Sequence, residues 1–200
     1  MELSEVIRRR RMVRSYTDQP VDPAAVERAL EHAIRAPSAG FSQGWAFLLL
    51  DTPDDVRRFW RVTTPGESDA DAWMLGMREA PVLVVPLSCK AAYLDRYAEP
   101  DKGRTDRDES WWPAPYWDID TGMAALLVLL TAVDEGLGAC FFGVPTDRIE
   151  AFKHEFGVPA DHHPIGAITL GHPAPVDRVG GSARTRPRRT TDQVVHRGGW

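Results

Sequence analysis

Basic side chains that could hold an anion gather at both ends of this chain. Near the start they are Arg8, Arg9, Arg10, Arg11 and Arg14, and near the end Arg184, Arg186, Arg188, Arg189 and Arg197. A guanidinium offers planar, forked donors that meet a phosphate with paired hydrogen bonds. Because the net charge of the whole chain is −5, the two clusters are local exceptions. They indicate either one localised anion site or two solvated tails.

No side chains suggest acid, base or nucleophilic catalysis. The chain contains no Walker phosphate loop, no GxGxxG after a strand and no GxSxG elbow, and its acids and histidines form no recognisable triad. Cys89 and Cys140 lack metal-ligand spacing, and the adjacent His162 and His163 cannot act as an i, i+4 pair on a helix. We therefore assign no catalytic side chain and expect no metal.

Bulk composition favours one soluble domain. The 200 residues are 43% hydrophobic, which is enough for a sizeable core. The acidic balance gives no general attraction to nucleic acid or to an anionic membrane. Two cysteines without a disulfide pattern and no long apolar N-terminal segment indicate a reduced, cytoplasmic protein.

One stretch, residues 118 to 143, is expected to organise the fold. Asp118 and Asp120 suit the positive end of a helix, and residues 123 to 133 are apolar on nearly all sides, as in a core or interface helix. This apolar part is shorter than the roughly 20 residues of a membrane span. Gly136 and Gly138 predict the stop, followed by a buried strand over 139–142 that ends at Gly143.

The remaining elements follow from caps and periodicity. Asp22 and Pro23 predict a helix start, and residues 37–44 form a small-residue loop that either approaches a ligand or simply turns. Helices are predicted over 4–11, 52–61, 71–79, 91–97 and 146–156, the last capped by Thr146 and ended by Gly157, and strands over 45–50, 82–87 and 164–170. Residues 99–110 indicate an exposed, mobile loop. Nearby aromatics could form a substrate wall or packing: Trp111, Trp112, Tyr116 and Trp117.

Several motifs occur together in a familiar order. They are residues 10–16 (RRMVRSY) with Pro20-Val21, residues 36–39 (APSA) with Gln43 and Trp45, residues 120–143 and especially 135–140 (EGLGAC), residues 168–173 (ITLGHP) and residues 186–189 (RPRR). As an ordered set spanning nearly the whole chain, they resemble the nitroreductase family of flavin-dependent oxidoreductases. Departures from that family's usual pattern stand at Met12, Phe41 and Gly44.

The resemblance implies an α+β fold with a mixed, mainly antiparallel sheet surrounded by helices. It implies a single domain over residues 1–200, built as a homodimer, with the long apolar helix in the interface. Residues 174–200 would form an arm exchanged between the two chains. Residues 89–117 would form a variable insertion that could close as a lid.

The family's cofactor is FMN, and the resemblance carries its contacts onto this chain by position. The implied cofactor-binding residues are Arg10, Arg11, Met12, Arg14, Pro37, Ser38, Ala39, Gly40, Gln43, Phe141, Phe142, Gly143, Arg186, Arg188 and Arg189. Of these, residues 37–40 would come from the partner chain. The implied substrate-facing residues are Phe41, Trp111, Trp112, Tyr116 and Trp117.

The implied activity is hydride transfer from NADH or NADPH to a small electron-poor acceptor, such as a nitroaromatic or a quinone, by a ping-pong mechanism. Two alternatives use the same anion site. One is a binding or storage protein for a flavin or deazaflavin coenzyme, and the other is an enzyme that consumes reduced flavin with oxygen.

Overall fold

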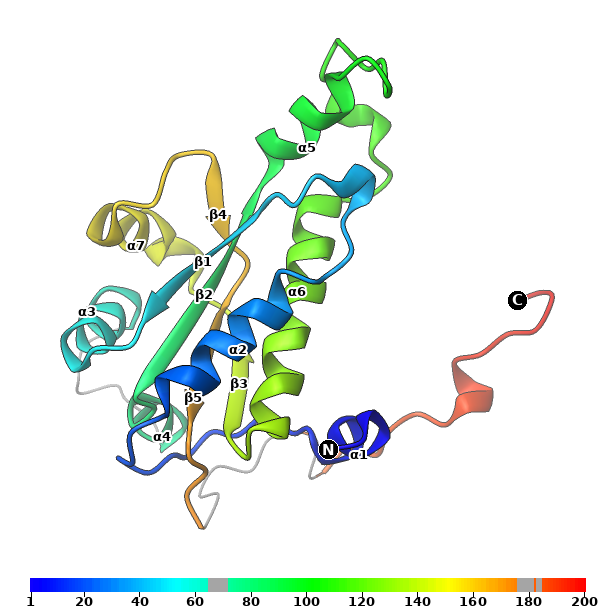
Figure 1. Cartoon of the computed structure of the whole chain (residues 1–200). Helices are drawn as coiled ribbons and strands as arrows, with labels where there is room; N and C mark the ends of the chain where they lie inside the picture. The colour runs from blue at the N-terminus through cyan, green and yellow to red at the C-terminus, as the bar shows by residue number, and fades with distance from the viewer. Residues whose placement is uncertain (65–71, 176–181, 183–184) are drawn as a thin grey trace.

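The computed structural model describes residues 1–64, 72–175, 182 and 185–200, and its ribbon is shown in Figure 1. Its helices are α1 (Leu3–Arg9), α2 (Pro23–Ala33), α3 (Pro53–Thr63), α4 (Ala72–Arg78), α5 (Lys90–Ala98), α6 (Tyr116–Asp134) and α7 (Ile149–Phe156). Its strands are β1 (Trp45–Leu50), β2 (Val82–Cys89), β3 (Gly138–Phe142), β4 (His162–Pro164) and β5 (Ala167–Gly171). The start of the helix predicted over 71–79 lies outside the described residues.

The strands form one sheet in the order β1-β2-β5-β3, with β4 pairing with β2. All strand pairings among the described residues are antiparallel, and the one parallel contact is a bridge between Met12 and Ala139. The predicted mixed, mainly antiparallel sheet with surrounding helices is therefore confirmed.

The sheet separates two hydrophobic cores. Along β2, Val82 and Val84 face the core formed with α2 and α6, whereas Leu83, Val85 and Leu87 face the core formed with α3 and α7. This alternation follows from the two-residue period of a strand. The sequence of β2, apolar except for Ser88, thus reflects burial on both faces.

Local sequence signals set many of the boundaries. The Asp22 side chain accepts from the Ala24 amide and Pro23 opens α2, as predicted. Gly157 ends α7 with φ +63°, and Gly136 follows α6 with φ +74°, both in the left-handed region that glycine tolerates. Thr146 is not the cap of α7, because a short 3-10 turn intervenes before Ile149.

Two predicted strands differ from the observed ones for backbone reasons. The strand predicted over 164–170 is divided into β4 and β5, with Gly166 between them. The strand predicted to end at residue 87 continues to Cys89 through Pro86. Proline cannot donate to the ladder, and Pro86 lies between the end of β5 pairing at Val84 and the start of β4 pairing at Leu87.

Helix α6 is apolar on both sides. Its length and composition would suffice for a membrane span, but one face packs in the core against the sheet and α2. Its other face leaves Ile119 and Leu126 exposed by 43% and 46%, and the neighbouring α1 exposes Leu3 and Ile7. Part of this surface is an apolar depression of about 470 Å³, lined by residues that include Leu3, Leu127 and Leu130.

An ion pair ties α2 to the end of α6. Arg28 donates from Nε and Nη2 to the two carboxylate oxygens of Glu135, each at 2.7 Å, and this contact holds the pKa of Glu135 below its usual range. A carboxyl with a lowered pKa stabilises the fold above its unfolded-state pKa, and the contribution is lost as pH falls through the folded-state value.

We therefore expect Glu135→Gln to lower the free energy of unfolding at pH 7 by about 0.5–1 kcal/mol, a small effect because both side chains are partly exposed. The difference from wild type should fade in urea titrations below about pH 4. Glu31→Gln, on an exposed residue of α2, is the control and should change little. If Glu135→Gln lowered the free energy of unfolding equally at pH 7 and pH 3, the stabilisation would not come from the ion pair with Arg28.

Candidate functional site

The N-terminal segment after α1 runs along the outer edge of β3. The Val13 amide donates to the Ala139 carbonyl at 2.9 Å, and the Phe141 amide donates to Met12 Sδ at 3.4 Å. Gly138 permits this approach, since a Cβ there would lie 2.9 Å from the Val13 side chain. The structure thus brings the arginines of residues 10–14 beside β3, which ends at Phe142, one residue before Gly143.

Arg10 carries the clearest signal of an anion site. Its Nη1 atom is buried and has no hydrogen-bond partner among the residues that the structure describes. Arg14 is half-buried and donates from Nη1 to the Met12 carbonyl at 3.2 Å, whereas Arg11 is exposed. A buried cationic donor without a partner is costly, so this donor set fits an anionic group such as a phosphate.

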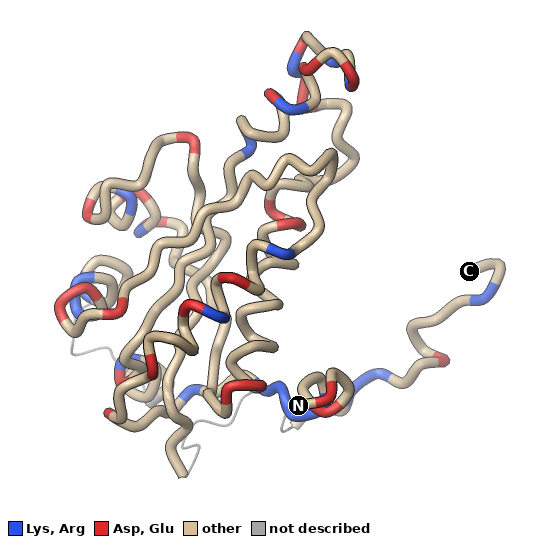
Figure 2. The backbone as a smooth tube through the Cα atoms, viewed as in Figure 1, with Lys and Arg blue, Asp and Glu red and all other residues tan. Residues whose placement is uncertain are grey.

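The basic residues of the C-terminal arm are exposed. Arg186, Arg188 and Arg189 all face solvent, and Arg189 Nη2 donates to the Gln193 carbonyl at 2.6 Å. In the view of Figure 2, basic residues of the N-terminal segment and of the first part of the arm lie along the lower edge of the molecule. The arm then extends away from the sheet (Figure 1).

The loop over residues 37–43 is held in an unusual backbone conformation. Gly40, Phe41 and Gln43 have φ values of 60°, 55° and 50°. A Cβ on Gly40 would lie 2.6 Å from a ring carbon of Tyr97, so this position requires glycine both for its φ and for space. The Gln43 amide donates to Ser38 Oγ, closing the loop on itself.

Three residues that the sequence analysis did not assign to the site hold this loop. Asp120 Oδ2 accepts from the Ala39 amide and from the Tyr93 hydroxyl, both at 2.8 Å. Arg96 Nε donates to the Gly40 carbonyl at 2.9 Å. Asp120 was expected only to suit the helix end; a charged residue just before a long apolar run was the signal for a further partner.

The contact with Asp120 also helps to keep the Tyr93 hydroxyl protonated. Burial first, and the hydrogen bond to Asp120 second, raise the pKa of Tyr93 far above its usual value. The phenol therefore remains protonated at neutral pH and acts as a donor to the buried carboxylate.

We expect Asp120→Ala to leave the Ala39 amide and the Tyr93 hydroxyl without their acceptor. Each unsatisfied buried donor costs about 1–3 kcal/mol, so the free energy of unfolding should fall and the 37–43 loop should exchange amide hydrogens faster. Asp118→Ala is the matched control on the same helix: it removes a contact with Ser88 of β2 rather than a bond to the 37–43 loop. Unchanged exchange at residues 37–43 in Asp120→Ala would contradict this anchoring role.

The predicted substrate-facing aromatics divide into two groups. Trp112 packs among Tyr93, Tyr97, Tyr116 and Trp117, with ring centroids 4.5–6.4 Å apart across this cluster. Phe41 and Trp111 are instead exposed by 73% and 56%. The cluster joins α5 to the start of α6, so packing accounts for Trp112, Tyr116 and Trp117, while Phe41 and Trp111 offer free surface.

The side chains at the end of β3 point to opposite faces of the sheet. Phe141 packs against the α2–α6 core, and Phe142 stacks on Trp60 at 5.4 Å in the other core. Any contact of Phe142 with a cofactor would therefore use its backbone. Gly143 is exposed.

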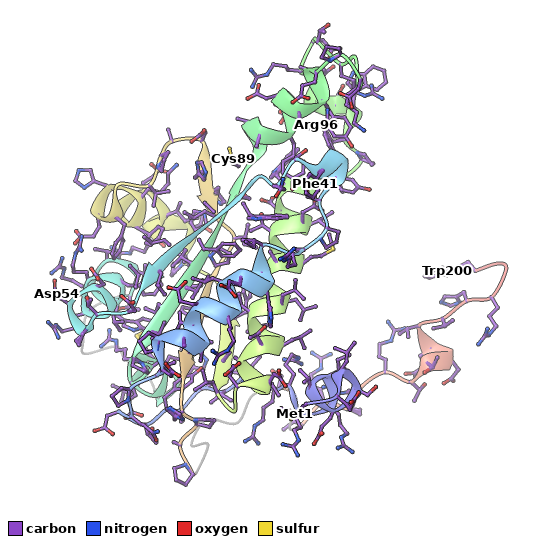
Figure 3. The ribbon with its side chains drawn as sticks, viewed as in Figure 1. Met1, Phe41, Asp54, Cys89, Arg96 and Trp200 are labelled. Atoms are coloured by element: carbon purple, nitrogen blue, oxygen red, sulfur yellow. The ribbon has the colours of Figure 1, made fainter. Side chains whose placement is uncertain are left out.

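The two groups of predicted cofactor residues lie at opposite ends of α6 within one chain. The 37–43 loop is bound to Asp120 near the start of α6. The segment that carries Arg10 and Arg14 contacts Ala139 just beyond the end of α6, where Met1 also pairs with Asp134. At 1.5 Å per residue, these two helix positions are about 21 Å apart. Figure 3 shows Phe41 and Arg96 near one end of α6 and Met1 near the other.

This fold and this arrangement of residues agree with comparisons with known proteins. The sequence profile of the nitroreductase family matches residues 7–172, so the chain belongs to the nitroreductase family. A relative in Methanothermobacter thermautotrophicus, provisionally named NADH dehydrogenase/NAD(P)H nitroreductase, is 27% identical over 177 residues, covering 87% of this chain and 78% of its own length. A relative of the same name in Archaeoglobus fulgidus is 26% identical, with 86% of each chain covered.

Solved structures support the same fold. The structure of NfrA1 from B. megaterium has a TM-score of 0.77 at 19% identity, covering all of this chain and 75% of its own. A nitroreductase family protein from Clostridium difficile has a TM-score of 0.70 at 18% identity, with both chains covered completely. The predicted family is confirmed, and the chain is an oxidoreductase of that family.

Proposed function

We propose that the chain is an FMN-dependent, cytoplasmic oxidoreductase that passes hydride from NADH or NADPH to a small electron-poor acceptor by a ping-pong mechanism. The observation that supports this most directly is the buried Nη1 atom of Arg10, which has no partner among the described residues. This atom lies in the segment that runs beside β3. A phosphate oxygen of FMN would give it the anionic hydrogen-bond acceptor that it lacks.

The phosphate would be held by arginines from both ends of the chain. Arg10 is half-buried and pre-positioned, and Arg14 is fixed by its bond to the Met12 carbonyl. Arg11, Arg186 and Arg188 are exposed and would turn toward a dianion, whereas Arg189, also exposed, would first have to leave the Gln193 carbonyl to which its Nη2 donates. Met12 uses its thioether to hold β3, which leaves phosphate binding to the neighbouring arginines.

The ring of the cofactor would lie between the end of β3 and the loop of residues 37–43. Among the described residues the Phe141 amide donates to a thioether, which is a weak acceptor that a better one can replace. Backbone donors of this kind stabilise negative charge on a ring. Pro37, Ser38, Ala39, Gly40 and Gln43 would contribute the opposing surface. FMN itself supplies the hydride exchange with the nicotinamide and the acceptor.

A homodimer would unite the separated halves of the site. Each chain carries the arginines at one end of α6 and the loop at the other, and the apolar outer face of α6 between them is exposed. A two-fold interface over this face would pair the arginines of one chain with the loop of its partner, twice. The arm, exposed throughout residues 185–200, would cross to the partner and anchor there through Val194, Val195 and Trp200.

Residues 89–117 would determine the choice of acceptor. In Figure 1 α5 and the loop after it extend beyond the end of the sheet. Trp111 is exposed there and has the Arg104 guanidinium 4.1 Å from its ring centroid. An exposed aromatic beside a cation can meet a flat, electron-poor acceptor, and the segment could close over it as a lid.

The test is an anaerobic half-reaction. Purified protein should be yellow, should bleach on addition of NADPH or NADH, and should regain its colour when a quinone or nitroaromatic is added. Colour without bleaching would instead favour a coenzyme storage protein. Recovery of colour only with oxygen would favour an enzyme that consumes reduced flavin. Colourless protein that takes up no added FMN would contradict the proposal.

A further inference from the structure

The end of β2 brings together three side chains of the kinds that bind transition metals. Cys89 is the last residue of β2, and the antiparallel register places His162 of β4 directly opposite it. Directly opposed residues project from the same face of a sheet, so the thiol and the imidazole are held together by backbone pairing. Asp161 immediately precedes His162. Cys89 is labelled in Figure 3.

The potential ligand atoms are close enough to share one ion. The Cys89 sulfur, an Asp161 carboxylate oxygen and a His162 ring nitrogen all lie within 4.8 Å of one another. Asp161 Oδ1 lies 2.9 Å from His162 Nδ1, and Oδ2 lies 3.8 Å from Cys89 Sγ. Ligands at zinc distances of about 2.0–2.3 Å are separated by roughly 3.5 Å in a tetrahedron, so only small side-chain shifts are needed.

The cluster combines one buried ligand with two that solvent can reach. Cys89 is only 7% exposed and is a free thiol, whereas the side chains of His162 and Asp161 are exposed by 24% and 54%. An ion can therefore enter from solvent and meet the thiolate on the inner side. Asp161 also lines a neighbouring cavity of about 550 Å³, which leaves room for a fourth ligand such as water.

We propose that Cys89, Asp161 and His162 form a zinc-binding site with three protein ligands and one open position. One thiolate, one imidazole and one carboxylate form a mixed donor set that suits borderline-soft Zn²⁺ and is poorly suited to Mg²⁺ or Ca²⁺. Sequence spacing gave no sign of this site, because Cys89 and Asp161 are 72 positions apart and only the pairing of Cys89 with the neighbouring His162 brings them together.

An ion at this position would brace the 37–43 loop indirectly. Cys89 is the residue from which α5 starts, and its amide donates to the Gly44 carbonyl at 2.8 Å. Helix α5 also carries Tyr93 and Arg96, which hold the loop through Asp120 and Gly40. The ion would thus tie β4 to the base of the helix that supports the loop.

The test is metal titration of tag-free, full-length protein after dialysis against a chelator. We expect one equivalent of Zn²⁺ to bind per chain, and Co²⁺ in its place to show the near-ultraviolet charge-transfer absorbance of a thiolate ligand. Cys89→Ser should remove the charge-transfer band and weaken zinc binding at least roughly tenfold, since one of three ligands is lost.

Two further variants keep the test decisive if Cys89→Ser folds poorly. Asp161→Asn and His162→Gln alter partly exposed side chains and should each weaken zinc binding several-fold while leaving the circular dichroism spectrum unchanged. His154→Gln, on the exposed surface of α7, is the matched control and should bind zinc as the wild type does. Cobalt binding without a thiolate band, or equal zinc affinity in wild type, Asp161→Asn and His162→Gln, would overturn the proposal.

Discussion

Leu126→Asp is expected to convert the proposed homodimer into monomers and to abolish tight FMN binding. Leu126 is 46% exposed on the outer face of α6, so a carboxylate there is solvated in a single chain but would be buried across a two-fold interface. An uncompensated buried charge costs about 3–5 kcal/mol, which raises the dimer dissociation constant by at least about a hundredfold. Light scattering after size-exclusion chromatography measures the mass.

Leu75→Asp is the matched control for this variant. Leu75 is a leucine of α4 that is 55% exposed, so the same substitution adds the same charge without touching α6. It should leave mass and flavin content unchanged. A Leu126→Asp protein that is folded, dimeric and yellow would refute the proposed interface.

Arg10→Ala is expected to lower FMN affinity by about 10- to 100-fold. Its buried Nη1 has no partner among the described residues, so its hydrogen bond to a phosphate would be charge-assisted and shielded from water. Such a bond contributes about 1.5–3 kcal/mol, and 1.4 kcal/mol is a factor of ten in affinity. Quenching of FMN fluorescence on titration with apoprotein measures the effect.

Riboflavin distinguishes a phosphate contact from a general loss of structure. It lacks the phosphate, so Arg10→Ala should leave its weaker binding nearly unchanged. Arg8→Ala removes the same charge from an exposed position of α1 and should leave FMN affinity within about twofold. If Arg10→Ala lowered the affinity for FMN and for riboflavin equally, Arg10 would support the fold rather than contact the phosphate.

Elements marked by local chemistry were predictable from the sequence. Asp22 and Pro23 start α2 because a side-chain acceptor and a fixed φ favour a helix start, and the apolar run over residues 45–50 forms β1 with the predicted bounds. The family motifs allowed the sheet to be anticipated. The side-chain directions along β3 were harder to predict. Phe141 and Phe142 are adjacent and of the same type, yet the pleat of the strand directs their side chains into different cores.

The missed features all depend on contacts between distant residues. Asp120 reads as a helix-start acid, and only the folded chain brings the Ala39 amide and Tyr93 to it. Likewise, nothing between Cys89 and His162 signals their pairing in the β2–β4 ladder. Hydrophobic periodicity indicates which face of a segment packs against the core. Contacts between residues that are distant in the sequence depend instead on the topology of the fold.

The position of the arginines and the 37–43 loop at opposite ends of α6 has a genetic consequence. If each site takes one half from each chain, a subunit defective in Arg10 and a subunit defective in Asp120 can complement each other. Their hybrid would hold one wholly intact site and one doubly impaired site, so mixed and reassociated subunits would regain up to half of the wild-type activity per hybrid. Two inactive alleles expressed together would then restore function.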